Sequence, residues 1–162
     1  MHRTRIAITA SVMALMPPAI AAADLPFGTS CSASTSPMNF GAYDPFASGL
    51  LTTVSTLTLN CSGGIGLLIP YEVRLSSGQS GNVLQRQMAH ETLNSPLNYQ
   101  IYTSVLRTNI WGDGVSGTSV GGTILIQLGG SVVTRIAYGS MQSGQNVRSG
   151  TYGDTVVVSF VF

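Results

Sequence analysis

Very few side chains in this sequence could carry out acid–base or nucleophilic chemistry. The 162 residues include six acidic residues, seven basic residues and two histidines. His90 is the one histidine outside the N-terminal segment, so a Ser-His-Asp triad would have to use it. It lies in a polar stretch, and the carboxylates are too scattered to define an acid/base pair. We therefore predict no catalytic residues and expect His90 to be a solvated loop residue.

Two further patterns match cofactor or metal motifs in their residue types, but each lacks a feature that the chemistry requires. Residues 112–117 match Gly-x-Gly-x-x-Gly, but a dinucleotide site needs that loop to lead from a buried strand into a helix. No helical pattern follows, so we predict an ordinary turn. Cys31 and Cys61 supply only two of the four ligands of a structural zinc site, and no nearby histidine completes it. The sequence predicts no cofactor, no metal and no small-molecule substrate.

The N-terminal segment is typical of a secretory signal peptide. Arg3 and Arg5 precede an apolar run from Ile6 to Ile20, and three alanines follow in a pattern that suits cleavage. We predict a signal peptide at residues 1–23 and one exported domain at residues 24–162. Cleavage after Ala21 and an uncleaved membrane anchor are the alternatives.

Export and an even cysteine count predict a disulfide between Cys31 and Cys61. The segment after residue 23 has no lysine and only five arginines against six acidic residues. Because nucleic-acid binding needs a clustered basic surface, this composition predicts no nucleic-acid partner.

The elements that must position these residues are strands, because apolar residues recur at every second position. This alternation predicts strands over 56–61, 71–75, 97–101, 123–128, 132–138 and 152–162. Gly129-Gly130 predicts a hairpin turn between the fourth and fifth of them. Residues 83–93 are expected to form a loop with one helical turn. Strands with one apolar face predict an all-β fold of antiparallel sheets packed as a sandwich or closed as a barrel.

The last predicted strand is long, regular and apolar, and it lacks the lysine or proline that usually protects a sheet edge. Its apolar face comprises Tyr152, Val156, Val158, Phe160 and Phe162. Either this edge accepts a strand from a partner, or it pairs with the first strand of its own sheet.

Taken together, residues 31–162 resemble the spore coat protein U domain family, which includes subunits of archaic chaperone–usher pili. The resemblance is carried by Cys31, Phe40-Gly41, Tyr43, Pro45, Cys61, Tyr71-Glu72-Val73, Arg86, Met88, Leu97-Asn98-Tyr99, Tyr102, Arg107, Trp111-Gly112-Asp113-Gly114, Tyr138-Gly139, Gln145-Asn146-Val147-Arg148, Gly150, Tyr152, Asp154 and the final strand. It implies an incomplete immunoglobulin-like sandwich that lacks its last strand. It also implies three kinds of partner: a periplasmic chaperone, an outer-membrane usher and other fibre subunits.

The expected function is therefore a secreted structural subunit of a surface fibre or coat that supports adhesion and biofilm formation. Between the predicted cleavage site and Cys31, only Leu25 and Phe27 could fill apolar pockets of a neighbour, so we expect a weak strand donor. A small outer-membrane β-barrel and a stand-alone periplasmic coat-type domain are the alternatives, and a secreted enzyme on a sandwich scaffold is a more distant one.

Overall fold

Extended segments make up nearly all the regular structure of the described residues. The computed structural model describes residues 8–12, 19–20, 25 and 28–162. The strands are β1 (Ile8–Val12), β2 (Ala19–Ile20), β3 (Ser30–Thr35), β4 (Met38–Tyr43), β5 (Leu50–Ser62), β6 (Leu68–Leu75), β7 (Gln87–His90), β8 (Leu97–Asn98), β9 (Gln100–Tyr102), β10 (Val120–Leu125), β11 (Ser131–Gln142), β12 (Thr151–Asp154) and β13 (Val158–Val161). Two short 3-10 helices, η1 (Gly78–Ser80) and η2 (Val83–Gln85), lie between β6 and β7.

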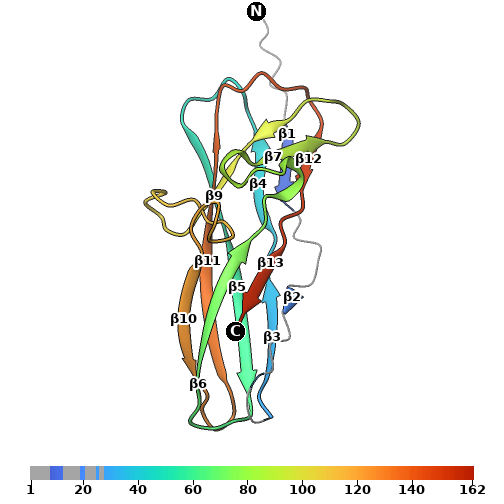
Figure 1. Cartoon of the computed structure of the whole chain (residues 1–162). Coiled ribbons are helices and arrows are strands. Elements are labelled where there is room, and N and C mark those ends of the chain that lie inside the picture. The colour runs from blue at the N-terminus through green and yellow to red at the C-terminus, as the bar shows by residue number, and fades with distance from the viewer. Residues whose placement is uncertain (1–7, 13–18, 21–24, 26–27) are drawn as a thin grey trace, which may run out of the picture.

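One layer of the elongated molecule is the antiparallel sheet β3-β5-β11-β9. All of β11 pairs with β5, from Ser131 opposite Cys61 to Gln142 opposite Leu50, and the two strands run along most of the molecule (Figure 1). Alternate residues of β5, among them Leu57, Leu59 and Cys61, are buried, as the period of two predicts.

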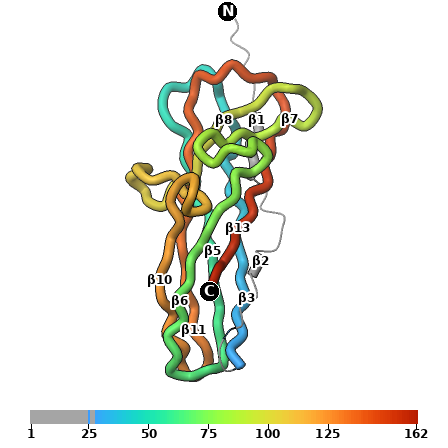
Figure 2. The backbone as a smooth tube through the Cα atoms, in the orientation of Figure 1, coloured from blue at the N-terminus to red at the C-terminus, as the bar shows by residue number. Residues whose placement is uncertain are grey.

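The other layer consists of two sheets with the strand orders β10-β6-β13-β2 and β4-β1-β12-β7-β8. The backbone trace in Figure 2 shows the C-terminal part of the chain descending through this layer towards the C-terminus. Every pairing between two of the named strands within residues 28–162 is antiparallel. Among the named strands of the described residues, the parallel pairings both involve the N-terminal strands, β1 with β12 and β2 with β13.

Among the described residues, one apolar core contains buried side chains from both layers. Its largest fully buried members include Trp111, Tyr152 and Phe160. The indole Nε1 of Trp111 donates to the Val73 carbonyl at 3.0 Å, so the one polar atom of this buried side chain is satisfied. The predicted all-β fold of antiparallel sheets packed as a sandwich is confirmed.

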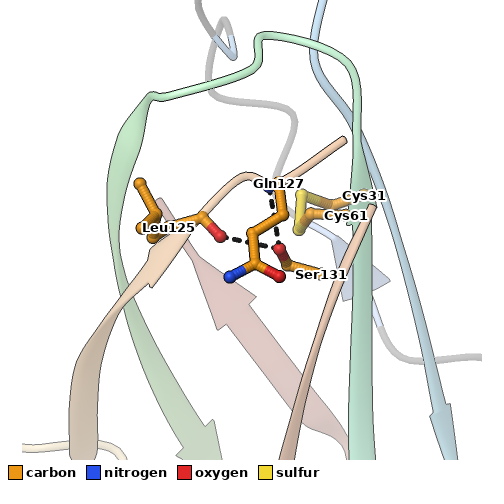
Figure 3. Close-up of a disulfide and its surroundings, with 5 residues drawn as sticks. All are labelled: Cys31, Cys61, Leu125, Gln127 and Ser131. Atoms are coloured by element: carbon orange, nitrogen blue, oxygen red, sulfur yellow. Dashed lines mark hydrogen bonds between the residues drawn. A yellow bond between two sulfur atoms is a disulfide. The ribbon is translucent and has the colours of Figure 1, made fainter. Parts of the chain in front are cut away.

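The predicted disulfide is present between Cys31 on β3 and Cys61 on β5. These residues are direct cross-strand neighbours, with a Cα–Cα distance of 4.1 Å. Figure 3 shows the bridge beside the turn that leads into β11, where the Ser131 hydroxyl donates to the Leu125 carbonyl at 2.6 Å and accepts from the Gln127 amide at 3.1 Å. The bridge therefore links the two strands at one end of the molecule.

Four local predictions need correction. The predicted strand 97–101 is two strands, β8 and β9, which lie in different sheets. The Gly129-Gly130 turn does not form a hairpin, because β10 pairs with β6 and β11 pairs with β5 in the opposite layer. The predicted strand 152–162 is two strands, β12 and β13, which lie in different sheets. The predicted loop 83–93 contains η2, as expected, but also the strand β7. The turn predicted for residues 112–117 is confirmed, since Asp113 accepts hydrogen bonds from the amides of Val115 and Ser116 and no helix follows.

Candidate strand-acceptor edge

The strands β12 and β13 are bounded on one side by the domain and on the other by the N-terminal segment. On the domain side, β12 pairs with β7 and β13 pairs with β6. On the other side, β1 runs parallel to β12 and β2 runs parallel to β13. We call the sides of β12 and β13 that face β1 and β2, away from β7 and β6, the acceptor edge. In this structure it is covered by residues 8–12 and 19–20, which lie within the predicted signal peptide.

On its other side, β1 is bordered by β4, a strand that was not predicted from the sequence. We call the space that β1 and β2 fill, between β4 and the acceptor edge, the slot. β1 pairs antiparallel with β4, so it lies between β4 and β12 in one sheet. Met38, Phe40 and Tyr43 of β4 are buried in the core. The alternation of Met38 and Phe40 around Asn39 is the signal that could have revealed this strand.

The structure brings together the five residues predicted for the acceptor edge. Tyr152, Val156, Val158 and Phe160 are buried in the core, and the half-buried Phe162 packs against it. Their side chains therefore form part of the apolar core between the two layers. Whether they receive side chains of a partner strand stays a prediction.

Hydrogen bonds to Ser76, which follows β6, hold the segment between β12 and β13. The Ser76 amide donates to the Val157 carbonyl at 3.0 Å, and its hydroxyl accepts from the Val157 amide at 2.9 Å. The chain changes sheets at residues 155–157, so the acceptor edge consists of two short runs that are both anchored to the domain.

A buried polar network fixes the end of β12 through Asp154, which is 2 % exposed. Its carboxylate accepts hydrogen bonds from the amides of Gln79 and Thr155, both at 2.7 Å, and from the Tyr99 hydroxyl. Burial raises the pKa of Tyr99, and the neighbouring Asp154 raises it further, so the phenol remains a proton donor.

Arg86 lies next to this network and is fully buried. Its guanidinium donates to the carbonyls of Ser76 and Trp111, at 2.7 and 2.8 Å, and also to the Gln100 side chain and the Val83 carbonyl. Burial lowers the pKa of Arg86. The side chain is satisfied by the protein itself and links η2, β9 and the segment after β6.

His90 is not the solvated loop residue that the sequence predicted. It ends β7, is 8 % exposed and packs edge-to-face against Tyr152 at 5.0 Å. Its Nδ1 accepts from the amides of Thr92 and Leu93, both at 3.1 Å, and its Nε2 lies 3.1 Å from the Ser149 carbonyl. These contacts place the proton on Nε2 and give His90 a role in supporting the turn beside β12.

The two residues predicted to donate to a neighbour are only partly described. Leu25 is half-buried and packs against the core of its own chain. Phe27 and the predicted cleavage site after Ala23 lie outside the described residues. Within the described chain, no three His, Cys, Asp or Glu side chains are grouped to hold a metal ion, and no helix there is long and apolar enough to cross a membrane.

Comparison with known proteins identifies the family. The model of the Spore Coat Protein U domain matches residues 19–159. Protein U of Myxococcus xanthus is 34% identical over 137 residues, which cover 77% of this chain and 71% of that protein. The chain belongs to the Spore Coat Protein U domain family. The resemblance carried by the sequence motifs is thereby confirmed.

The fold of this Spore Coat Protein U domain is also found in a pilus system. One chain in the crystal structure of the CsuC–CsuE chaperone–tip adhesion subunit pre-assembly complex, from the archaic chaperone–usher Csu pili of Acinetobacter baumannii, aligns with a TM-score of 0.55 and 23% identity. The alignment covers 83% of this chain but only 40% of that chain, so the chain spans less than half the length of this neighbour. The likeness supports the predicted immunoglobulin-like fold.

Proposed function

We propose that this protein is a secreted structural subunit of a bacterial surface fibre or coat, whose sandwich is completed by a strand from another polypeptide. The observation that carries the proposal is the position of β1 and β2, which cover the acceptor edge and run parallel to β12 and β13. These residues fall within the predicted signal peptide. Its removal would therefore leave a slot between β4 and β12–β13.

An open slot of this kind would lower the stability of the folded protein. The backbone N–H and C=O groups of β4 and β12 that face β1 would lose their partners, and part of the apolar core would become accessible to water. An extended apolar segment restores both the hydrogen bonds and the burial, which is the chemistry of β-strand addition. The partner strand should therefore be extended, mostly apolar and at least as long as the five residues of β1.

The partners we propose are a periplasmic chaperone that covers the slot in transit, an outer-membrane usher and other fibre subunits. The structural neighbour comes from a complex between a chaperone and a subunit of an archaic pilus, which supports the first of these partners by analogy. The protein would cross the periplasm and act at the cell surface, where a fibre or coat can support adhesion and biofilm formation. The role is structural and requires no catalysis.

Peptide complementation tests the proposal. The protein is expressed in a bacterial periplasm so that the cell removes the signal peptide, and thermal unfolding of the purified monomer is followed with and without a peptide of residues 6–20. We expect the peptide to bind and to raise the unfolding midpoint. The matched control is the same peptide with Ala10→Pro, which removes a backbone donor at the centre of β1 and should not stabilise the protein.

A processed monomer that is fully stable alone and binds neither peptide would contradict strand complementation. That result would favour the stand-alone coat-type domain instead. Co-expression with the periplasmic chaperone of an archaic chaperone–usher system adds a second measurement, because the yield of soluble protein should rise when the chaperone covers the slot.

A further inference from the structure

A cleft of about 710 Å³ opens beside β9, away from the acceptor edge. Its walls come from η2, from β8 and β9, from the loop after β9 and from the adjoining ends of β5 and β11. None of its lining residues lies on β3, β4, β12 or β13. The loop between β9 and β10 projects from the side of the molecule opposite β2 and β13 (Figure 1), so a partner strand at the acceptor edge would leave this cleft open.

Some polar side chains of the cleft are fully used by the fold. Gln100 accepts from Arg86 at 2.7 Å and donates to the Val83 carbonyl at 3.1 Å. Gln145 bonds both backbone groups of Asn98, at 2.8 Å each. These amides hold the walls together and are not available to a ligand.

Other polar side chains in the cleft form no hydrogen bonds that hold its walls together. The side chains of Gln85, Tyr102, Ser140 and Gln142 line it without a hydrogen bond to any other described residue. The apolar residues Leu50, Leu84 and Ile110 lie among them. A ligand that carries several hydroxyl groups and also presents C–H surface would suit this mixture.

Arg107 gives the cleft its one uncommitted charge among the described residues. The other charged lining residue, Arg86, is already paired with carbonyls and Gln100. The Nε of Arg107 is buried and has no hydrogen-bond partner, and its guanidinium forms no ion pair within the described chain. Arg107 also has a φ of 54°, and it is the one non-glycine residue with a positive φ among the described residues.

The backbone conformation of Arg107 costs about 1 kcal/mol for a residue with a Cβ, and glycine would adopt it freely. An arginine in such a conformation, with an unpartnered guanidinium at a polar cleft, indicates a function for the side chain. The planar guanidinium fork suits a carboxylate, to which it can donate two parallel hydrogen bonds.

We propose that this cleft binds a short acidic saccharide, with Arg107 paired to the carboxylate of a uronic acid. The free hydroxyl and amide groups of Tyr102, Ser140, Gln85 and Gln142 would bond the sugar hydroxyls. Leu50 and Leu84 would contact the C–H face of a ring. The cleft volume lies within the range of about 300–1,000 Å³ that is typical of small-ligand sites.

Calorimetric titration of the purified protein with tetragalacturonate tests the site. We expect saturable binding that weakens by about tenfold or more in Arg107→Gly. This variant relieves the backbone strain, so it should fold at least as well as the wild type and any loss of binding reports the side chain. Arg148→Gln is the matched control, because Arg148 is exposed and outside the cleft, and it should bind as the wild type does.

Two further ligands identify the chemistry that is recognised. Methyl-esterified tetragalacturonate keeps the hydroxyl groups but lacks the charge, and it should bind about tenfold more weakly or worse. Tetraglutamate carries the charge without the sugar ring and should also bind weakly. The proposal is overturned if tetragalacturonate gives no binding at millimolar concentration, if Arg107→Gly retains wild-type affinity, or if either comparison ligand binds as well. None of these results bears on strand complementation, which is read out by the peptide of residues 6–20.

Discussion

At the residue scale, Arg86 joins several segments that are far apart in the chain. Its guanidinium meets two carbonyls at under 3 Å and the Gln100 side chain at 2.7 Å. Lysine cannot reproduce this fork, because its single ammonium cannot reach carbonyls on three sides. We predict that Arg86→Lys lowers the free energy of unfolding by about 2–4 kcal/mol, as measured by urea denaturation.

The control for this prediction is Arg148→Lys, since the Arg148 side chain is exposed and makes no hydrogen bond within the described chain. Its effect should stay within about 0.5 kcal/mol. Equal effects of the two substitutions would show that the hydrogen bonds of Arg86 contribute little to stability.

A second prediction at the residue scale is that Asp113 makes the stability of the fold depend on pH. Hydrogen bonds from the backbone amides of Ser116 and Val115, at 2.6 and 2.8 Å, lower the pKa of its carboxyl in the folded state. The unfolded chain then takes up the proton at higher pH than the folded one. The stabilisation is therefore present above the usual aspartate pKa of about 4 and is lost as the pH falls below it.

Carbon-13 NMR of the carboxyl group should show Asp113 titrating below the usual aspartate range. Asp113→Asn keeps the accepting oxygen and removes the titration, so its stability should change less between pH 6 and pH 3 than that of the wild type. An Asp113 that titrates at or above its usual pKa would contradict the role of these two hydrogen bonds.

At the scale of elements, the disulfide joins β3 to β5 across 30 residues of sequence. We predict that the double substitution Cys31→Ala with Cys61→Ala lowers the free energy of unfolding by about 3 kcal/mol, because the unfolded chain gains the freedom that the closed loop had removed. Chemical denaturation of the wild type under reducing conditions should give a loss of similar size. Ser32→Ala, at an exposed neighbouring position on β3, is the control and should have little effect.

The strands of the sandwich could largely be predicted from alternation alone. Leu57, Tyr71 and Ile101 are buried as the period of two requires, since one face of each strand packs on the core. The prediction that was wrong concerned how consecutive strands are connected. Gly129-Gly130 supplies a turn, but a turn does not determine which sheet receives the next strand, and here β10 and β11 lie in different layers.

The site was harder to predict than the fold. The apolar face of the last strand was visible in the sequence, but its division at residues 155–157 depends on hydrogen bonds to Ser76, which is about 80 residues away in sequence. The burial of His90 likewise depends on Ser149 and Tyr152, which come from another part of the chain. Partners this distant leave no local pattern in the sequence.

At the scale of the whole molecule, surface electrostatics contribute little. The one ion pair in the described chain joins Arg74 to Glu72 on β6, and both side chains are partly exposed. Such pairs contribute about 0–1 kcal/mol and are screened by salt. We predict that the free energy of unfolding changes by less than about 1 kcal/mol between roughly 0.05 and 0.5 M NaCl. A much steeper dependence in urea denaturation would show that charges outside this pair matter.

The long ladder between β5 and β11 has a mechanical consequence. Its cross-strand hydrogen bonds lie perpendicular to the strands, and the strands run along the length of the molecule. Tension that slides the two strands past each other therefore loads the whole row of bonds at once, whereas a peeling force would break them singly. A molecule pulled along this axis resists shear with the combined strength of the ladder, and it should yield first where strands are short, as in the two runs of β12 and β13.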